Sequence, residues 1–291
     1  MKKYLSLLVV FATILALLVA CAGQTPSDAD VDPTDSVETD APTDEATEPL
    51  TIKVGATPVP HAEILAVVKD ILAKDNITLE IVEFNDYVQP NLATDEGEID
   101  ANYFQHITYL NNFNAENGTD LVSVANVHYE PFGIYAGKTA SLDDLADGAT
   151  VGIPNDPTNG GRALLLLQEQ GLITLPEDAG LEPTVLDIAE NPKNLKIEEL
   201  EAAQLPRSLD SLDIAVINGN YAMEANLTVA DALAIESAQG VAAEAYGNIL
   251  AVKAGNENDP AIQALVKTLL SDEVRTYTQT TYADGSVQPI F

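Results

Sequence analysis

Residues Ile153–Gly171 read IPNDPTNGGRALLLLQEQG, a sequence that is typical of one fold class. A short strand, Thr150–Pro154, ends in a polar turn, and the leucine run that follows has helical length. A strand that leads through a turn directly into a helix is the repeating unit of α/β proteins. The stretch also places Arg162 directly after two glycines, in a chain whose formal net charge is -33.

The same alternation continues on both sides of this stretch. The pattern predicts strands at Leu50–Ala56, Ile77–Phe84, Ile99–Tyr103, Leu121–Val127, Phe132–Ala136, Thr150–Pro154, Thr184–Ile188, Asp213–Asn218 and Asn248–Lys253. It predicts helices at His61–Lys74, from about His106, after Ser141 with Asp144 in a near capping box, along the leucine run, at Glu198–Ala203 and from Asp259-Pro260. The expected fold class is therefore α/β with a mostly parallel sheet.

The start of the chain is typical of a lipoprotein signal peptide. Residues 1–21 carry two lysines, an apolar run and a small-residue end, and they close on LVAC, which resembles a lipobox. Cys21 is the only cysteine, so the chain has no internal disulfide and no other thiol nucleophile. We expect Cys21 to be lipidated, and the alternative is an ordinary signal peptide with an incidental cysteine.

Residues 22–50 contain nine acidic residues and no lysine or arginine. Such a segment has little apolar surface to bury and its charges repel each other, which predicts a disordered acidic tether of about 30 Å or more. A specific acidic binding tail is the alternative. The tether would hold the globular part near a membrane, on its extracytoplasmic face, without embedding it.

About 240 residues remain, which is enough for one large or two modest domains. Their negative charge argues against nucleic acid as a partner, because the field of the protein would oppose association. A zwitterion or a cation would not be repelled.

Arg162 follows a strand end, where ligands bind in open α/β sheets. Asn159 can cap the helix, Gly160 and Gly161 allow a ligand to approach the backbone, and a guanidinium offers a two-pronged contact to a carboxylate. These residues predict a site for one carboxylate. The alternative is that Arg162 pairs with an acidic residue of the protein itself.

Seven stretches in family order resemble the methionine-binding lipoprotein family, the substrate-binding components of methionine ABC importers, which includes glycyl-methionine binders. They are FNDYVQPN (84–91), IDANYFQH (99–106), EPFGIY (130–135), IPNDPTNGGRALLLLQ (153–168), ENPKNLKIEELEAAQLPRSLD (190–210), AVINGNYA (215–222) and YGNILAVK (246–253). They cover nearly the whole of the chain after the tether.

The resemblance implies a two-lobe periplasmic-binding-protein-like fold with two crossovers between the lobes and a ligand cleft between them. One lobe would be residues 51–135 plus 246–291, and the other residues 136–245. The family's pocket maps onto Tyr87, Phe104, His106, Tyr109, Asn159, Arg162, Asn218 and Asn248.

By the same resemblance, Arg162 would hold the ligand carboxylate, Asn218 and Asn248 would bind its amino and carboxylate groups, and the aromatic residues would enclose a thioether. Each residue also has a structural alternative. Tyr87 could lie on a surface turn, Phe104 and Tyr109 could be packing residues, His106 could be a structural histidine, and the two asparagines could form turns. Ile107-Thr108 and Gly219 depart from the family pattern, which leaves the selectivity of the pocket open.

We therefore expect a lipid-anchored solute-binding protein, monomeric and without a cofactor, that delivers methionine to an ABC permease and its ATPase. A methionyl dipeptide is the alternative ligand. A metal-binding lipoprotein is disfavoured because His61, His106 and His128 are far apart in the sequence, and no metal site is expected. An enzyme is disfavoured because no GxSxG, P-loop or GxGxxG motif is present.

Overall fold

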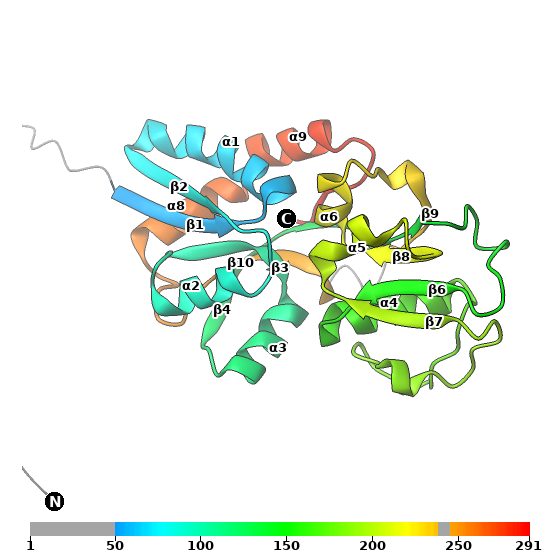
Figure 1. Ribbon diagram of the computed structural model, residues 1–291. Coiled ribbons are helices and arrows are strands. Elements are labelled where there is room, and N and C mark those ends of the chain that lie inside the picture. Colours follow the sequence, from blue (N-terminus) through cyan, green and yellow to red (C-terminus); the bar gives the residue numbers. More distant parts are fainter. Residues whose placement is uncertain (1–49, 238–244) are drawn as a thin grey trace, which may run out of the picture. The chain divides into compact units, whose positions relative to one another are not determined.

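The computed structural model describes residues 50–237 and 245–291 (Figure 1). The expected signal peptide, Cys21 and all of the expected tether except Leu50 lie outside the described residues. The described residues belong to one compact unit. Across the described ranges, no helix has both the length and the apolar character that a membrane span requires.

The first sheet has six strands in the order β11-β4-β10-β3-β1-β2. β1 pairs in parallel with β2 and β3, whereas β10 runs antiparallel to β3 and β4, and β11 antiparallel to β4. The strands are β1 (Leu50–Ala56), β2 (Ile77–Glu83), β3 (Ala101–His106), β4 (Leu121–Tyr129), β10 (Gly247–Lys253) and β11 (Gln288–Pro289).

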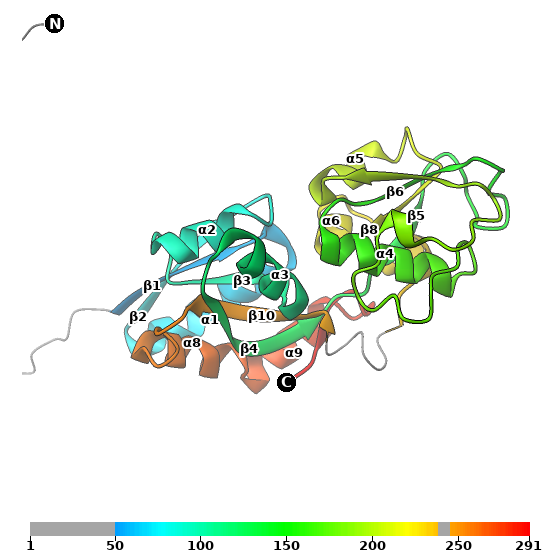
Figure 2. The same cartoon turned by 90° about the horizontal axis from the view of Figure 1, so that it is seen from below.

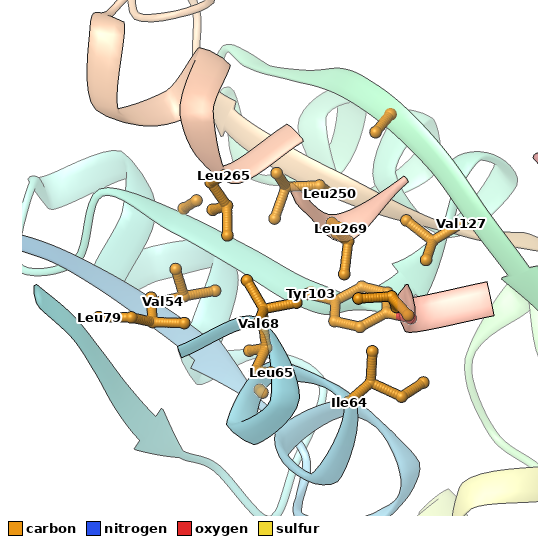
Figure 3. Packing of buried hydrophobic residues seen from close by; sticks show 14 of the residues in the cluster. Val54, Ile64, Leu65, Val68, Leu79, Tyr103, Val127, Leu250, Leu265 and Leu269 are labelled. Atoms are coloured by element: carbon orange, nitrogen blue, oxygen red, sulfur yellow. The ribbon is translucent and has the colours of Figure 1, made fainter. Parts of the chain in front are cut away.

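Helices cover both faces of this sheet (Figures 1 and 2). On one face lie α1 (Glu63–Leu72), α8 (Pro260–Leu269) and α9 (Asp272–Thr281), and on the other lie α2 (Gln89–Glu96) and α3 (Ile107–Asn117). Figure 3 shows the core of the first face, where Leu65 and Leu265 pack with Val54, Tyr103 and Leu250. Burial of each large apolar side chain contributes about 1.5–3 kcal/mol.

The second sheet has five strands in the order β7-β6-β8-β5-β9, in which β6 pairs in parallel with β7 and β8, and β5 antiparallel with β8 and β9. Its strands are β5 (Gly133–Ala136), β6 (Thr150–Pro154), β7 (Lys196–Leu200), β8 (Ile214–Ile217) and β9 (Ala232–Ile235). Its helices are α4 (Pro157–Glu169), α5 (Leu205–Ser208) and α6 (Gly219–Glu224).

The alternation of side chains along β8 separates the two cores of this sheet. Ile214 and Val216 pack with the leucine run of α4, whereas Ala215 and Ile217 pack with Leu205 of α5 and with α6. Helices therefore cover both faces of the second sheet as well.

The chain passes between the sheets twice, from β4 to β5 and from β9 back to β10. Strand pairing places β5 in the second sheet, so the sheets divide between Tyr129 and Gly133. Both sheets are mixed, and the expectation of a mostly parallel sheet is wrong because each chain passage brings in antiparallel strands.

Three local predictions are also wrong. Ser141 and Asp144 do bond to each other, but they close a turn rather than begin a helix. The segment expected as a strand at 184–188 is a short 3-10 turn, because Asp187 accepts from the backbone and hydroxyl of Thr184. The segment expected as a helix at 198–203 is the end of β7, which pairs with β6, followed by the start of a 3-10 turn at Ala202–Gln204.

Candidate functional site

A pocket of about 350 Å³, counting the space that opens to solvent, lies at the strand ends of both sheets. All eight residues expected from the sequence line it, and Gln105, Glu130, Gly219 and Asn220 complete the wall. The volume is at the small end of the range for small-molecule sites. The structure thus brings together residues that are far apart in the sequence.

The beginning of α4 is built differently from the prediction. Asp156, not Asn159, caps the helix, because its carboxylate accepts from the backbone N–H of Asn159, and Pro157 follows at the first helical position. A Cβ on Gly160 would lie 2.9 Å from the carbonyl oxygen of Pro154, and one on Gly161 would lie 2.7 Å from Cα of Glu182. The two glycines therefore admit the protein's own backbone rather than a ligand.

Arg162 is 4% exposed and forms an ion pair with Glu236. Its Nε lies 3.1 Å from both carboxylate oxygens, and its Nη2 donates to Glu236 Oε2 at 2.5 Å and to the carbonyl oxygen of Glu130 at 2.9 Å. The alternative that Arg162 pairs with an acidic residue of the protein is therefore realised. Glu236 thus occupies the Nε–Nη2 edge, one of the two edges through which a guanidinium makes a two-pronged contact.

Aromatic rings enclose this guanidinium. Its central carbon lies 4.3 Å from the ring centre of Tyr246 and 4.6 Å from that of Phe132. Burial by itself lowers the pKa of Arg162, but the Glu236 carboxylate outweighs burial, so the pKa lies above its usual value. Arg162 is a fixed positive charge at the pocket wall.

A short chain of amides runs beside it. Asn218 Nδ2 donates to Asn159 Oδ1 at 2.9 Å, and Asn159 Nδ2 donates to Asp156. Asn218 Oδ1 is buried and has no hydrogen-bond partner among the described residues. A buried acceptor of this kind requires a donor from water or a ligand.

His106 caps α3 and lines the same wall. Its Nδ1 accepts from the backbone N–H of Tyr109 at 3.0 Å, and its Nε2 lies 3.3 Å from Asn159 Oδ1, so the neutral ring carries its proton on Nε2. Burial first, and then the charge of Arg162, lower its pKa to about 3. His106 is thus a hydrogen-bonded structural histidine that also borders the pocket.

Tyr87, Phe104 and Tyr109 form the apolar wall, with ring centres 5.7–6.2 Å apart. Tyr221 stacks on Tyr87 at 5.0 Å. The hydroxyl of Tyr87 donates to Asn220 Oδ1 at 2.6 Å, and the side chain of Asn220 also interacts with the Glu224 carboxylate. The wall therefore combines an apolar surface with the amide of Asn220.

The sequence prediction missed a buried polar cluster behind the pocket. The rings of His61 and His128 lie 5.1 Å apart, and their Nε2 atoms lie 3.4 and 2.6 Å from Glu130 Oε1. His128 and Glu130 are two residues apart, a spacing that puts side chains on one face of a strand, but His61 gave no signal. Burial lowers the pKa of His61 to about 4 and that of His128 to about 3.

These three side chains are the kinds of ligand that bind zinc, and their donor atoms lie within 4.8 Å of one another. However, Thr57 and Tyr103 hydrogen-bond to the other nitrogens of the two rings. The separation of 2.6 Å between His128 Nε2 and Glu130 Oε1 is that of a strong hydrogen bond. Hydrogen bonds therefore account for the cluster.

Comparisons with known proteins give consistent results. A lipoprotein from Ruminococcus gnavus has a solved structure with a TM-score of 0.81 and 55% identity, which covers 83% of this chain and 99% of that one. The nutrient binding protein from Burkholderia cenocepacia, solved bound to methionine, has a TM-score of 0.78 and 46% identity, which covers 82% of this chain and 100% of that one. These similarities confirm the expected α/β, periplasmic-binding-protein-like fold.

The D-methionine-binding lipoprotein MetQ of Escherichia coli is 44% identical over 246 residues, which is 83% of this chain and 89% of MetQ. The profile of the NlpA lipoprotein family matches residues 52–291. The predicted resemblance is confirmed, and the chain belongs to the NlpA lipoprotein family.

Proposed function

We propose that this protein captures methionine outside the cytoplasm and delivers it to an ABC importer. Two relatives support the ligand, since one is named as a D-methionine-binding lipoprotein and another was solved bound to methionine. The relatives whose names state a function are binding proteins, and we propose binding without catalysis here as well.

The observation that carries the proposal is the composition of the pocket. One side is an aromatic wall, against which a thioether packs favourably, and the other is a group of amides beside the Arg162 guanidinium. Asn218 Oδ1 is a buried acceptor that no described residue satisfies. A small ligand with an apolar chain, an ammonium and a carboxylate would satisfy both sides.

The charges of the wall favour a zwitterion over an anion. Arg162 is matched by Glu236, and Glu130 adds a second buried carboxyl group. An anionic ligand would bring further negative charge to a site whose single guanidinium already has a partner. For the Arg162 contact we propose Nη1, because the contacts between described residues use Nε and Nη2.

We propose that the residues around the two sheets form two lobes. The first boundary lies between Tyr129 and Gly133 rather than at the expected residue 135, because β5 pairs within the second sheet, and the second boundary is kept near residues 245–246. We propose that the lobes close over the ligand at the two chain passages. Lipidation of Cys21 and a tether at 22–50 would hold this part near the outer face of a membrane. The permease with its ATPase, the monomeric state and the extracytoplasmic location belong to the same proposal.

Titration calorimetry tests the ligand. The full-length chain in detergent, unfolded and refolded to remove carried-over ligand, would be titrated with L-methionine, D-methionine, glycyl-methionine and glutamine. We expect binding of methionine in the micromolar range or tighter and no binding of glutamine. If the protein bound glycyl-methionine but not methionine, the ligand would be a dipeptide and not the free amino acid. If it bound none of the four compounds, the proposal would be refuted.

Mass spectrometry of the ligand released by denaturation tests the absence of catalysis. We expect methionine to be recovered intact after prolonged incubation with excess protein. Loss of methionine with the appearance of a product would refute a pure binding role.

A further inference from the structure

The side chain of Asn248 stands between the pocket and the buried cluster behind it. It lines the pocket, and its Oδ1 lies 3.0 Å from Nε2 of His61. His61 is 1% exposed, and its other ring nitrogen, Nδ1, lies 2.7 Å from the hydroxyl of Thr57. His61 therefore contacts Asn248 from the side away from the pocket.

Glu130 determines which nitrogen of His61 carries the proton. Its Oε1 lies 3.4 Å from His61 Nε2 and accepts from His128 Nε2 at 2.6 Å, and the backbone N–H of Asn220 also donates to the carboxyl group. If His61 Nε2 carried no hydrogen, its lone pair would face the lone pairs of Glu130 Oε1, and the two would repel each other. The proton of the neutral His61 ring therefore lies on Nε2, and Nδ1 accepts from Thr57.

A proton on His61 Nε2 in turn fixes the amide of Asn248. The N–H of the ring requires an acceptor, so Oδ1 of the amide faces His61 and Nδ2 faces the other way. Among side chains of the described residues, none accepts a hydrogen bond from this Nδ2. The two N–H groups of Asn248 are thus available to the pocket.

We propose that Glu130 and His61 are positioning residues that hold Asn248 with its N–H groups toward the pocket, which makes Asn248 a partner of the ligand carboxylate. This inference rests on the proposed function. The arrangement resembles metal sites, where a carboxylate fixes the tautomer and orientation of a histidine ligand. Here the group that is oriented is an amide.

Asn218 presents the opposite hydrogen-bonding group to the pocket, an acceptor where Asn248 presents donors. Its Nδ2 is used by Asn159, and its unpaired Oδ1 remains for a donor. The pocket therefore has an amide acceptor at Asn218 and amide donors at Asn248. A zwitterionic ligand would be bound in one orientation only, with its ammonium toward Asn218.

A double-mutant cycle with His61→Leu and Asn248→Ala tests the positioning role. Calorimetry on the full-length chain would measure methionine affinity for the parent, both single variants and the double variant. We expect His61→Leu to weaken binding about tenfold or more in the parent, but to have no further effect when Asn248 is already alanine. Equal losses in both backgrounds would overturn the inference, because His61 would then act independently of Asn248.

The conservative variant His61→Gln restores an N–H donor near the position of Nε2. We expect it to recover most of the affinity that His61→Leu loses, whereas a loss as large as that of His61→Leu would overturn the donor role. Thermal unfolding of every variant would separate a loss of fold from a loss of binding.

The tautomer can be measured without any ligand. The chain has three histidines, so ¹⁵N-histidine spectra of the full-length chain are simple, and the variant His61→Gln assigns the His61 signal. We expect the proton on Nε2, and a proton on Nδ1 would overturn the inference whatever the ligand is. If the parent protein showed the Nε2 tautomer but bound no methionine, the proposed function would be refuted. The assignment of Asn248 as a partner of the ligand carboxylate would then fail as well.

Discussion

Arg162 has two competing partners for one guanidinium. Glu236 occupies its Nε and Nη2 atoms, and the proposed function adds a ligand carboxylate. Both side chains of the pair are nearly buried, at 4% and 10% exposure, so removal of one partner leaves the other charge poorly solvated. The effect of a substitution on stability and its effect on binding must therefore be measured separately.

The single variant Arg162→Leu should destabilise the protein by about 3–5 kcal/mol, because Glu236 loses its partner. The double variant Arg162→Leu/Glu236→Leu should recover most of this free energy of unfolding and still bind methionine weakly. Urea unfolding and calorimetry would measure the two quantities. Parent-like affinity in the double variant would show that Arg162 does not contact the ligand.

The three histidines predict an acid-sensitive fold. Burial lowers the pKa of His61 to about 4 and those of His106 and His128 to about 3, whereas in the unfolded chain a histidine titrates near 6.5. Between pH 6.5 and about 4 the unfolded chain binds more protons than the folded protein. The free energy of unfolding should therefore fall as the pH falls, by up to about 1.4 kcal/mol per histidine and pH unit.

Glu130 acts in the opposite direction, because burial raises its pKa and its contribution to stability grows as the pH falls. Burial also raises the pKa of Glu224, to about 7, so two carboxyl groups oppose the three histidines. By pH 5 the histidines outweigh them, and the net effect of acid is a loss of stability. Urea unfolding at pH 7, 6 and 5 would measure the slope, and His106→Gln should reduce it. An unchanged slope in that variant would contradict the assignment of His106 as neutral.

At the scale of helices and strands, local patterns succeeded where one segment specifies its own structure. The unit from β6 to α4 follows from its strand, turn and leucine run, and α8 begins at its Asp259 cap as predicted. A helix was predicted at Glu198–Ala203, but the first half of this segment is the end of β7, whose pairing with β6 decides its structure. Such pairing is not visible in the local sequence.

The site was predictable mainly through the resemblance, and the remainder depends on long-range contacts. Glu236 pairs with Arg162 across 74 residues, and His61 meets Asn248 across 187 residues. No periodic pattern links residues at these distances. The carboxylate partner of Arg162 was foreseen as a possibility, but its identity was not.

The beginning of α4 is packed closely against a neighbouring segment of the chain at Gly161. Gly161 lies against the backbone of Glu182 and Leu181, which cannot move as a side-chain tip could. Gly161→Ala should therefore destabilise the protein by about 1–3 kcal/mol, the usual cost of overpacking. Urea unfolding would measure this cost.

Glu169→Ala is the matched control for Gly161→Ala, because Glu169 is exposed on the same helix. It should change the free energy of unfolding by less than about 0.5 kcal/mol. If Gly161→Ala were as stable as the parent protein, the backbone at 181–182 would have to move aside for the added methyl group at little cost in free energy.

At the scale of the whole binding unit, hydrogen bonds join elements of the two sheets across the pocket. Tyr87 donates to Asn220, and the hydroxyl of Tyr221 lies 3.4 Å from the carbonyl oxygen of Asn85. His106 meets Asn159 between α3 and α4. A ligand that fills the pocket would contact both groups of elements and so favour the arrangement in which these bonds form.

The variant Tyr87→Phe should weaken methionine binding, because it removes the donor to Asn220 Oδ1 and leaves that buried oxygen without a partner among the described residues. A cost of about 1–3 kcal/mol in affinity is typical of such a loss. Calorimetry would measure it. Tyr277→Phe is the matched control, because Tyr277 packs against the first core away from the pocket. Equal affinity in both variants would contradict a role for the Tyr87 hydroxyl.

Several tyrosines lie around the pocket, where a bound ligand would change their fluorescence. The chain has ten tyrosines, six phenylalanines and no tryptophan, so its near-ultraviolet fluorescence is dominated by the phenol rings. Tyr87 and Tyr109 line the pocket, Tyr221 stacks on Tyr87, and Tyr246 lies over the guanidinium of Arg162. The protein therefore carries its own optical reporter of occupancy, and a label-free emission titration could follow each ligand as it enters.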